Sequence, residues 1–372
     1  MMNIDAVEAA ILKKDPDGVV AALSEWDEPQ REAARESLDI FMLALGMDDH
    51  VAEPCDLKSD DPAVVAKRQR DGLAAMSRKD RTYDYEMSYI ARLALYGIAG
   101  LDHCVRRVCV VDYRRQAAQI MADRRPPWWD QWYRAVTSGE RLIEPEYWAL
   151  LYERGMVPAG TFGQVAEMFL YGLPGAMASS PQATQKVMQD IEACRELVYT
   201  AARNERILYN ASDWVPVIDW LRNEKLLDAS RLLGAVLDAL HQPFNQAERN
   251  GAVIFAKAAK ASGKVLAEHQ ARWAGLVADS QASVAGFAVG QLAKVQEAGL
   301  LDVQEAIAAL PHIFVHKPRT HAKKAVEMLA KIAEEPSHRS QAVEAITTAL
   351  MHPDKDVQTV ALDALDTHLQ PS

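Results

Sequence analysis

Six arginines between residues 106 and 125 form the densest group of side chains that could bind a charged partner. They occur as three adjacent pairs, with only Asp112 and Asp123 as acidic residues among them: Arg106 and Arg107, Arg114 and Arg115, and Arg124 and Arg125. A guanidinium presents a planar fork of donors to oxyanions, so these pairs could bind phosphate groups or an acidic protein. Alternatively, they pair with the acidic N-terminal segment of the same chain, which charge and nearness in sequence favour.

Three tryptophans follow the last arginine pair and could serve as a binding platform. They are Trp128, Trp129 and Trp132, and Tyr147 and Trp148 come shortly after them. Tryptophan and tyrosine dominate interface hot spots, so an exposed group could bind a protein or a nucleic-acid base. Helical spacing puts Trp128 and Trp132 on one face and turns Trp129 elsewhere. That spacing favours an aromatic core at a junction of helices.

A second basic cluster surrounds a predicted turn near residue 318. Its cations are Lys317, Arg319, Lys323 and Lys324. A groove that follows DNA needs basic residues spread over a long surface, whereas the sequence around this cluster is slightly acidic. We therefore favour a solvated turn over a nucleic-acid site here.

Spacings typical of catalytic, nucleotide or metal sites are missing from the sequence. It holds no GxSxG, no HExxH and no lysine in a glycine-rich phosphate loop. Cys104 and Cys109 are five residues apart on an apolar helix, so their thiols diverge. His312 and His316 straddle a predicted helix end. We expect no enzymatic activity, no cofactor and no metal.

Composition indicates an ordinary globular protein of the cytoplasm. Hydrophobic residues make up 49% and charged residues 25% of the 372 residues. There is no apolar run of membrane-spanning length and no recognisable signal peptide, so we expect no membrane association. Four scattered cysteines suit a reducing compartment. The net charge of −11 is concentrated in residues 1–62, which hold 16 acidic and 5 basic residues.

The elements that would position these residues are helices, and towards the C-terminus they repeat. Four segments share one layout: a helix, a short polar turn, and a second helix that carries an alanine and an apolar residue four positions later. Successive alanines lie 36, 37 and 36 residues apart. A fixed period of this length is typical of helical repeats that must stack to bury their apolar faces. The marker pairs are Ala252 and Ala256, Ala288 and Leu292, Ala325 and Leu329, and Ala361 and Leu365.

The last segment, LMHPDKDVQTVALDALDTHL, resembles a HEAT repeat. The resemblance lies in a Pro353-Asp354 turn, the Asp356-Val357 step, and the Ala361 and Leu365 pair. The other three turns lack the Asp-Val step, so their likeness is only periodic. Over roughly 145 residues it implies an α-α superhelix, a solenoid of antiparallel helix pairs.

A wider resemblance involves the run ADRRPPWWDQWYRAV and the downstream LLGAVLDAL. Together they resemble an uncharacterised bacterial family with HEAT-like repeats, whose genes can neighbour MoxR-type AAA+ ATPases and VWA-domain proteins. The resemblance implies a scaffold or adaptor with such a protein as partner. The residues that carry it are Arg124, Arg125, Pro127, Trp128, Trp129 and Trp132.

We therefore predict an all-α protein, a HEAT-like superhelix, in three regions. Residues 1–61 form an acidic helical segment, 62–225 an irregular helical region, and 226–372 four HEAT-like pairs. Within the first two regions we expect a loop over 46–61, a helix over 62–76, two helices within 85–111, and one long helix over 182–202. The predicted function is a non-enzymatic protein-interaction scaffold; the alternative is a nucleic-acid-binding protein that uses Arg106–Arg125.

Overall fold

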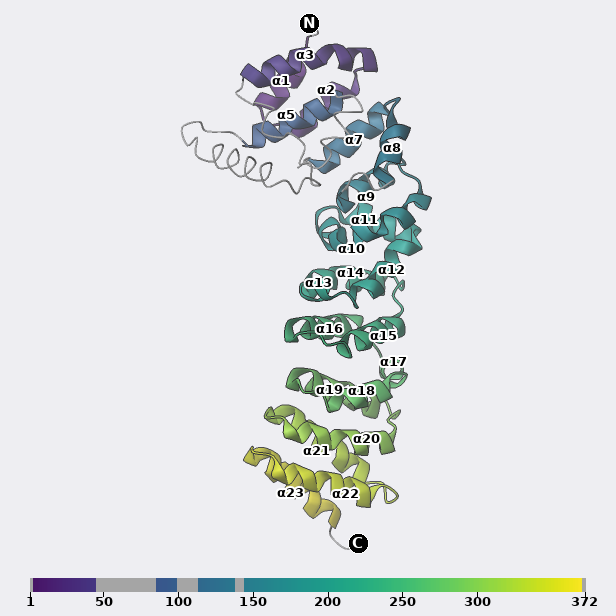
Figure 1. Ribbon diagram of the computed structural model, residues 1–372, viewed down its shortest axis with the longest axis vertical. Helices are drawn as coiled ribbons and strands as arrows, with labels where there is room; N and C mark the ends of the chain where they lie inside the picture. The colour runs from purple at the N-terminus through teal and green to yellow at the C-terminus, as the bar shows by residue number, and fades with distance from the viewer. Residues whose placement is uncertain (1–2, 45–84, 99–112, 138–143, 370–372) are drawn as a thin grey trace, which may run out of the picture. The chain divides into compact units, whose positions relative to one another are not determined.

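The computed structural model describes residues 3–44, 85–98, 113–137 and 144–369, which are coloured in Figure 1. These residues form α-helices and short 3-10 helices, and no strand occurs among them. The chain divides into two compact units, Met1–Cys194 and Arg195–Ser372. The fold class predicted from the sequence, all-α, is thus confirmed for the described ranges.

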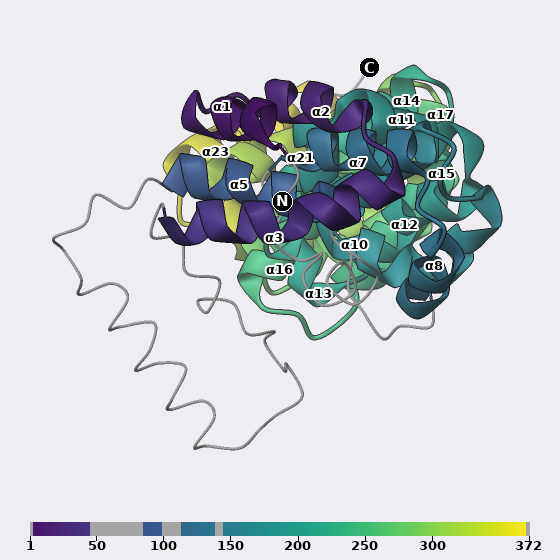
Figure 2. The same ribbon diagram turned by 90° about the horizontal axis from the view of Figure 1, so that it is seen from above.

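The first unit begins with helices α1 (Asp5–Leu12), α2 (Pro16–Ser24) and α3 (Glu28–Ala44), followed by α5 (Tyr85–Ile98) and α7 (Arg114–Arg124). Pro16 opens α2, and the Asp15 carboxylate caps it by accepting from the Gly18 N–H at 2.8 Å. Helix α5 packs against α2 and α3 and runs between them (Figure 2). The predicted loop 46–61, the helix 62–76 and the second helix expected before residue 111 lie outside the described residues.

The rest of the first unit contains α8 (Trp129–Thr137), α9 (Pro145–Glu153), α10 (Phe162–Ser179) and α11 (Pro181–Asp190). Helix α9 is central, because it packs against α7, α10 and α11. Four aromatic and aliphatic side chains of α9 are almost completely enclosed: Tyr147, Trp148, Leu150 and Leu151.

The prediction of one continuous helix over 182–202 is wrong. The chain leaves helical geometry at Ile191, whose φ of −122° and ψ of 105° are extended, and α12 (Glu192–Ala201) begins at the next residue. The predicted apolar face is nevertheless buried, since Val187 and Cys194 are at most 1% exposed. Two shorter helices satisfy the same apolar spacing, so periodicity did not reveal the break.

The second unit starts within α12, continues with α13 (Glu205–Leu208) and α14 (Val215–Asn223), and then contains four helix pairs (Figure 1). In each pair the predicted short polar turn joins the two helices, at residues 242–245, 278–280, 316–318 and 352–354. The first-helix side of the pairs is α15 (Ala229–Leu240), α17 with α18 (Gly263–Ala267, Gln270–Val277), α20 with a 3-10 helix (Val303–Ala309, Leu310–Val315), and α22 with a 3-10 helix (Arg339–Thr347, Thr348–Met351). The second helices are α16 (Gln246–Ala259), α19 (Ala282–Glu297), α21 (Arg319–Ala333) and α23 (Lys355–Leu369).

The second helices pack on one another in chain order, α16 on α19, α19 on α21, and α21 on α23. All eight marker residues of the sequence repeat are buried, none more than 7% exposed. Helix starts are encoded locally: Asp228 caps α15, Asp302 caps α20, and Asn245 forms a capping box with Glu248 on α16. Burial of the markers therefore follows from stacking of each pair on the next.

The second unit includes helices that precede the periodic array of the sequence. The unit starts at Arg195, ahead of Leu226, at which the periodic array begins. Helices α13 and α14 pack against α16, and the Trp214 ring lies 6.2 Å from that of Phe255. The residues before Leu226 thus cover the first pair of the array.

Candidate interaction surfaces

Carboxylates of the same chain hold two of the predicted arginines. Arg106 and Arg107 lie outside the described residues, and Arg115 and Arg125 are exposed. Arg114 pairs with Glu144 and, at 2.9 Å, with Glu146. Arg124 donates to both carboxylate oxygens of Glu28, from Nη2 at 2.7 Å, and its side chain is 2% exposed. The partner of Arg124 belongs to the acidic N-terminal segment, whereas those of Arg114 do not.

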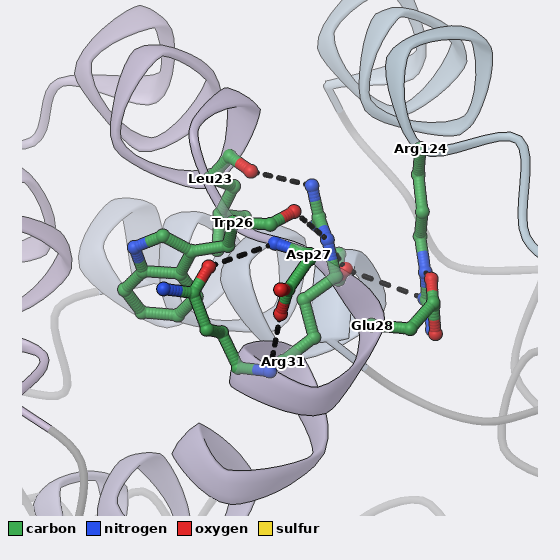
Figure 3. A network of polar contacts seen from close by, with 8 residues as sticks. Leu23, Trp26, Asp27, Glu28, Arg31 and Arg124 are labelled. Carbon is green, nitrogen blue, oxygen red and sulfur yellow. Dashed lines mark hydrogen bonds and ion pairs between the residues drawn. The ribbon is translucent and has the colours of Figure 1, made fainter.

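A buried arginine that the sequence did not single out lies beside this pair (Figure 3). Arg31 is 2% exposed and donates to three backbone carbonyls: to Leu23, to Trp26 at 3.1 Å, and to Gly97 at 2.6 Å. Burial, and then the nearby Arg124 charge, lower the pKa of Arg31 to about 10, so it stays protonated at neutral pH.

The position of Arg31 explains why it is charged yet buried. It joins the ends of α2 and α5 to the start of α3, because carbonyls at helix C-termini lack intrahelical donors. At the start of α3, Asp27 and Gln30 exchange backbone-to-side-chain hydrogen bonds of 2.8 Å. Only a fold that brings Gly97 to residue 31 shows this role, so no local sequence signal could have found it.

The tryptophan group is mostly turned inward. Trp132 is fully buried and stacks with Trp129 at 4.5 Å and with Trp148 at 6.3 Å between ring centroids. The expectation that Trp129 points away from Trp132 is wrong, because α8 starts at Trp129 and residues three apart are neighbours on a helix. Trp128 precedes α8, and the Arg124 guanidinium lies 5.2 Å from the centre of its ring. Trp128 and Trp129 remain partly exposed.

The second basic cluster lines a surface hollow of about 430 Å³ between α19, α21 and the start of α23. Lys317 is exposed on the turn outside it. Arg319 Nη1 and Lys323 Nζ both contact Asp356 Oδ2, at 2.9 and 3.2 Å. Lys324 Nζ lies 3.8 Å from Glu297 and 3.9 Å from Glu327. Three of the predicted site residues, Arg319, Lys323 and Lys324, thus come together at this hollow.

Polar contacts one repeat length apart connect neighbouring helix pairs. Ser283 donates to Asn250, and Lys323 donates to Asp356, each across 33 residues of sequence. Arg249 is enclosed and donates to Asp279 at 2.9 Å and to the Leu240 carbonyl at 2.9 Å. Other contacts of this kind are Arg203 and Arg272 with Asp238, Arg231 with Glu196, and Gln304 with His338. These charges serve the packing of adjacent pairs.

No protein-family model matches this chain, and no curated protein or solved structure is significantly similar to it. In the described ranges, histidine, cysteine, aspartate and glutamate side chains form no group of three or more that could hold a metal ion. No helix in those ranges is long and apolar enough to cross a membrane. The surfaces described above must therefore be interpreted from their own geometry and charge.

Proposed function

We propose that the chain is a HEAT-like α-α superhelix that acts as a non-enzymatic scaffold or adaptor for another protein. One observation carries the proposal: equivalent residues of four successive helix pairs, 36 or 37 residues apart, are buried by the same kind of pair-on-pair stacking. Stacked helix pairs of this type present an extended surface suited to binding proteins.

The use of the charged residues supports a scaffold over a nucleic-acid-binding protein. Arg114 and Arg124 are neutralised by Glu146 and Glu28, which reduces the charge available for phosphates. In the second unit, Arg203, Arg231 and Arg249 pair with carboxylates of neighbouring helices. A surface that follows a polyanion needs cations that remain free for it.

The partner class follows from the resemblance to the bacterial HEAT-like family. An AAA+ ATPase or a VWA-domain protein is the first candidate. Exposed lysines on two successive second helices, Lys257 and Lys294, offer a direct way to detect contact with this surface.

Affinity capture from the native host followed by amine cross-linking and mass spectrometry tests the proposal. We expect a specific protein that cross-links to Lys257 or Lys294 in preference to Lys13, Lys14 and Lys186, which are exposed lysines of the first unit. Cross-links confined to the first unit would contradict the proposed surface. Turnover of a substrate by the purified chain, or tight binding to DNA at low salt, would contradict the scaffold function.

A further inference from the structure

The hollow beside α21 is open at the position where α19 carries Gly290. A Cβ atom placed on Gly290 would meet nothing within 4 Å. By the repeat spacing, the equivalent positions on α16 and α21 hold Ile254 and Glu327. Gly286, one turn earlier on α19, is different, because a Cβ atom there would lie 2.2 Å from the His321 ring. The imidazole thus fills the space at Gly286, and the space at Gly290 stays open.

The lining of the hollow carries more positive than negative charge. Arg319, Lys323 and Lys324 provide three permanent cations, against the carboxylates of Asp356 and Glu327. Arg319 and Lys323 share a single oxygen of Asp356. Burial, and then the neighbouring His316, lower the pKa of His321. Its ring is therefore neutral at physiological pH and adds no charge to the hollow.

The cations of the hollow are accessible to a ligand. The side chains of Arg319 and Lys324 are 61% and 43% exposed. Lys324 approaches its two carboxylates no closer than 3.8 Å, which exceeds hydrogen-bonding distance. The first turn of α21 begins after Pro318, which cannot cap it with a side chain, so the positive end of the helix dipole adds to the potential here.

We propose that this hollow binds a carboxylate-bearing segment of the partner protein, with Lys324 and Arg319 as the anion-contacting residues and Gly290 as the residue that makes room. The inference rests on the proposed scaffold function and specifies its partner chemistry. A short acidic peptide fits better than a nucleic acid, because the three cations lie in one hollow, whereas a nucleic acid needs cations spread along its phosphate backbone.

Fluorescence anisotropy with a labelled oligoglutamate peptide tests the proposal on the full chain. We expect saturable binding that weakens about tenfold when salt is raised from about 50 to about 300 mM, because screening acts on exposed charges. Lys324→Ala and Gly290→Leu should each weaken binding about fivefold or more, the first by removing a cation and the second by filling the hollow. An oligoglutamine peptide of the same length should not bind.

Two matched variants control for unspecific effects. Lys331→Ala removes an exposed lysine of the same helix outside the lining, and Gly275→Leu places the same side chain at an exposed, unobstructed helical glycine on α18. Both should bind oligoglutamate like the unaltered chain. The proposal would be overturned if Lys331→Ala weakened oligoglutamate binding as much as Lys324→Ala, or if oligoglutamate did not bind at low salt. It would also be overturned if an oligothymidylate bound more tightly than oligoglutamate, or if inorganic phosphate displaced oligoglutamate at equal charge concentration.

The two proposals fail in different ways. If oligoglutamate does not bind, yet the captured protein still cross-links to the second helices, the hollow is not the acidic site and the scaffold function stands. If oligoglutamate binds at the hollow and no protein is captured, the anion site is real and the scaffold function is contradicted. Loss of the captured protein in Lys324→Ala but not in Lys331→Ala would support both.

Discussion

His352 donates a hydrogen bond from Nε2 to the backbone carbonyl of His316, at 2.9 Å and across 36 residues of sequence. The Nδ1 atom of the same ring accepts from the Asp354 N–H at 3.1 Å, so the Nε2 tautomer is required. His352 is fully buried. One neutral imidazole thus joins the turn of the last pair to the equivalent turn of the pair before it.

Replacing this histidine tests whether the turns are coupled. We expect His352→Ala to lower the free energy of unfolding by about 2–4 kcal/mol, because it opens a cavity at a buried site and leaves two part-buried backbone groups without their partner. His312→Ala replaces an exposed histidine in the 3-10 helix Leu310–Val315 and should change the free energy of unfolding by less than about 0.5 kcal/mol. Urea denaturation measures both, and equal effects would mean that the contact does not stabilise the stack.

Two equivalent positions of the repeat, Val326 and Leu362, differ in burial. Val326 on α21 is 1% exposed, whereas Leu362, 36 residues later on α23, is 50% exposed. We expect Leu362→Ala to cost under about 1 kcal/mol, whereas Leu329→Ala in the buried marker pair should cost about 2–5 kcal/mol. Equilibrium denaturation of the two variants checks this, and a large loss for Leu362→Ala would show that further contacts cover α23.

Two helical glycines should respond to alanine with opposite signs. A Cβ atom on Gly251 would lie 1.9 Å from the Leu208 carbonyl oxygen, so α16 and α13 can pack only if that residue is glycine. We expect Gly251→Ala to destabilise the second unit by about 1–3 kcal/mol through overpacking. Gly290→Ala meets no neighbour and should stabilise it by about 0.5–1 kcal/mol, because alanine is the better helix former. Thermal and urea denaturation measure both changes in the free energy of unfolding. Changes of the same sign in the two variants would contradict this geometry.

Arg31 should be essential to the first unit. Arg31→Met removes the donors to Leu23, Trp26 and Gly97 and leaves buried carbonyls unsatisfied, so we expect a loss of about 2–4 kcal/mol. Arg35→Met, one turn later on α3 and exposed, is the matched control and should have little effect. Hydrogen exchange of amides in α2 and α5 reports the change. Unaltered protection in Arg31→Met would show that these carbonyls find other donors.

The stability of the second unit should depend on His321 at mildly acidic pH. Burial lowers the pKa of His321 below its ordinary 6.5, so the unfolded chain binds the proton more readily than the folded one. Its contribution is therefore fully present above pH 6.5 and is lost as pH falls below that value towards the lowered pKa of the folded state. His321→Gln should flatten this part of the profile in denaturation series, whereas His312→Gln, at an exposed site, should leave it unchanged. A profile that His321→Gln does not alter would contradict the assignment.

The cationic residues of the candidate site could be predicted from the sequence, but their arrangement around a hollow could not. The sequence pointed to Lys317, Arg319, Lys323 and Lys324, because a cationic cluster at a turn is visible without a fold. Gly290 and Asp356 complete the hollow from helices on either side, 29 residues before and 37 residues after Arg319. Their relevance depends on which pairs stack, and no local pattern encodes that choice.

The four helix pairs of the second unit and their eight buried marker residues could be predicted from the sequence alone. Caps, prolines at turns and apolar spacing act within a few residues, so they are legible in the chain. The folded chain was needed to show that the helix breaks at Ile191, that Arg31 is buried against Gly97, that Arg124 pairs with Glu28, and that Trp129 stacks on Trp132. Most of these depend on partners distant in sequence, whose proximity is a property of the packed helices.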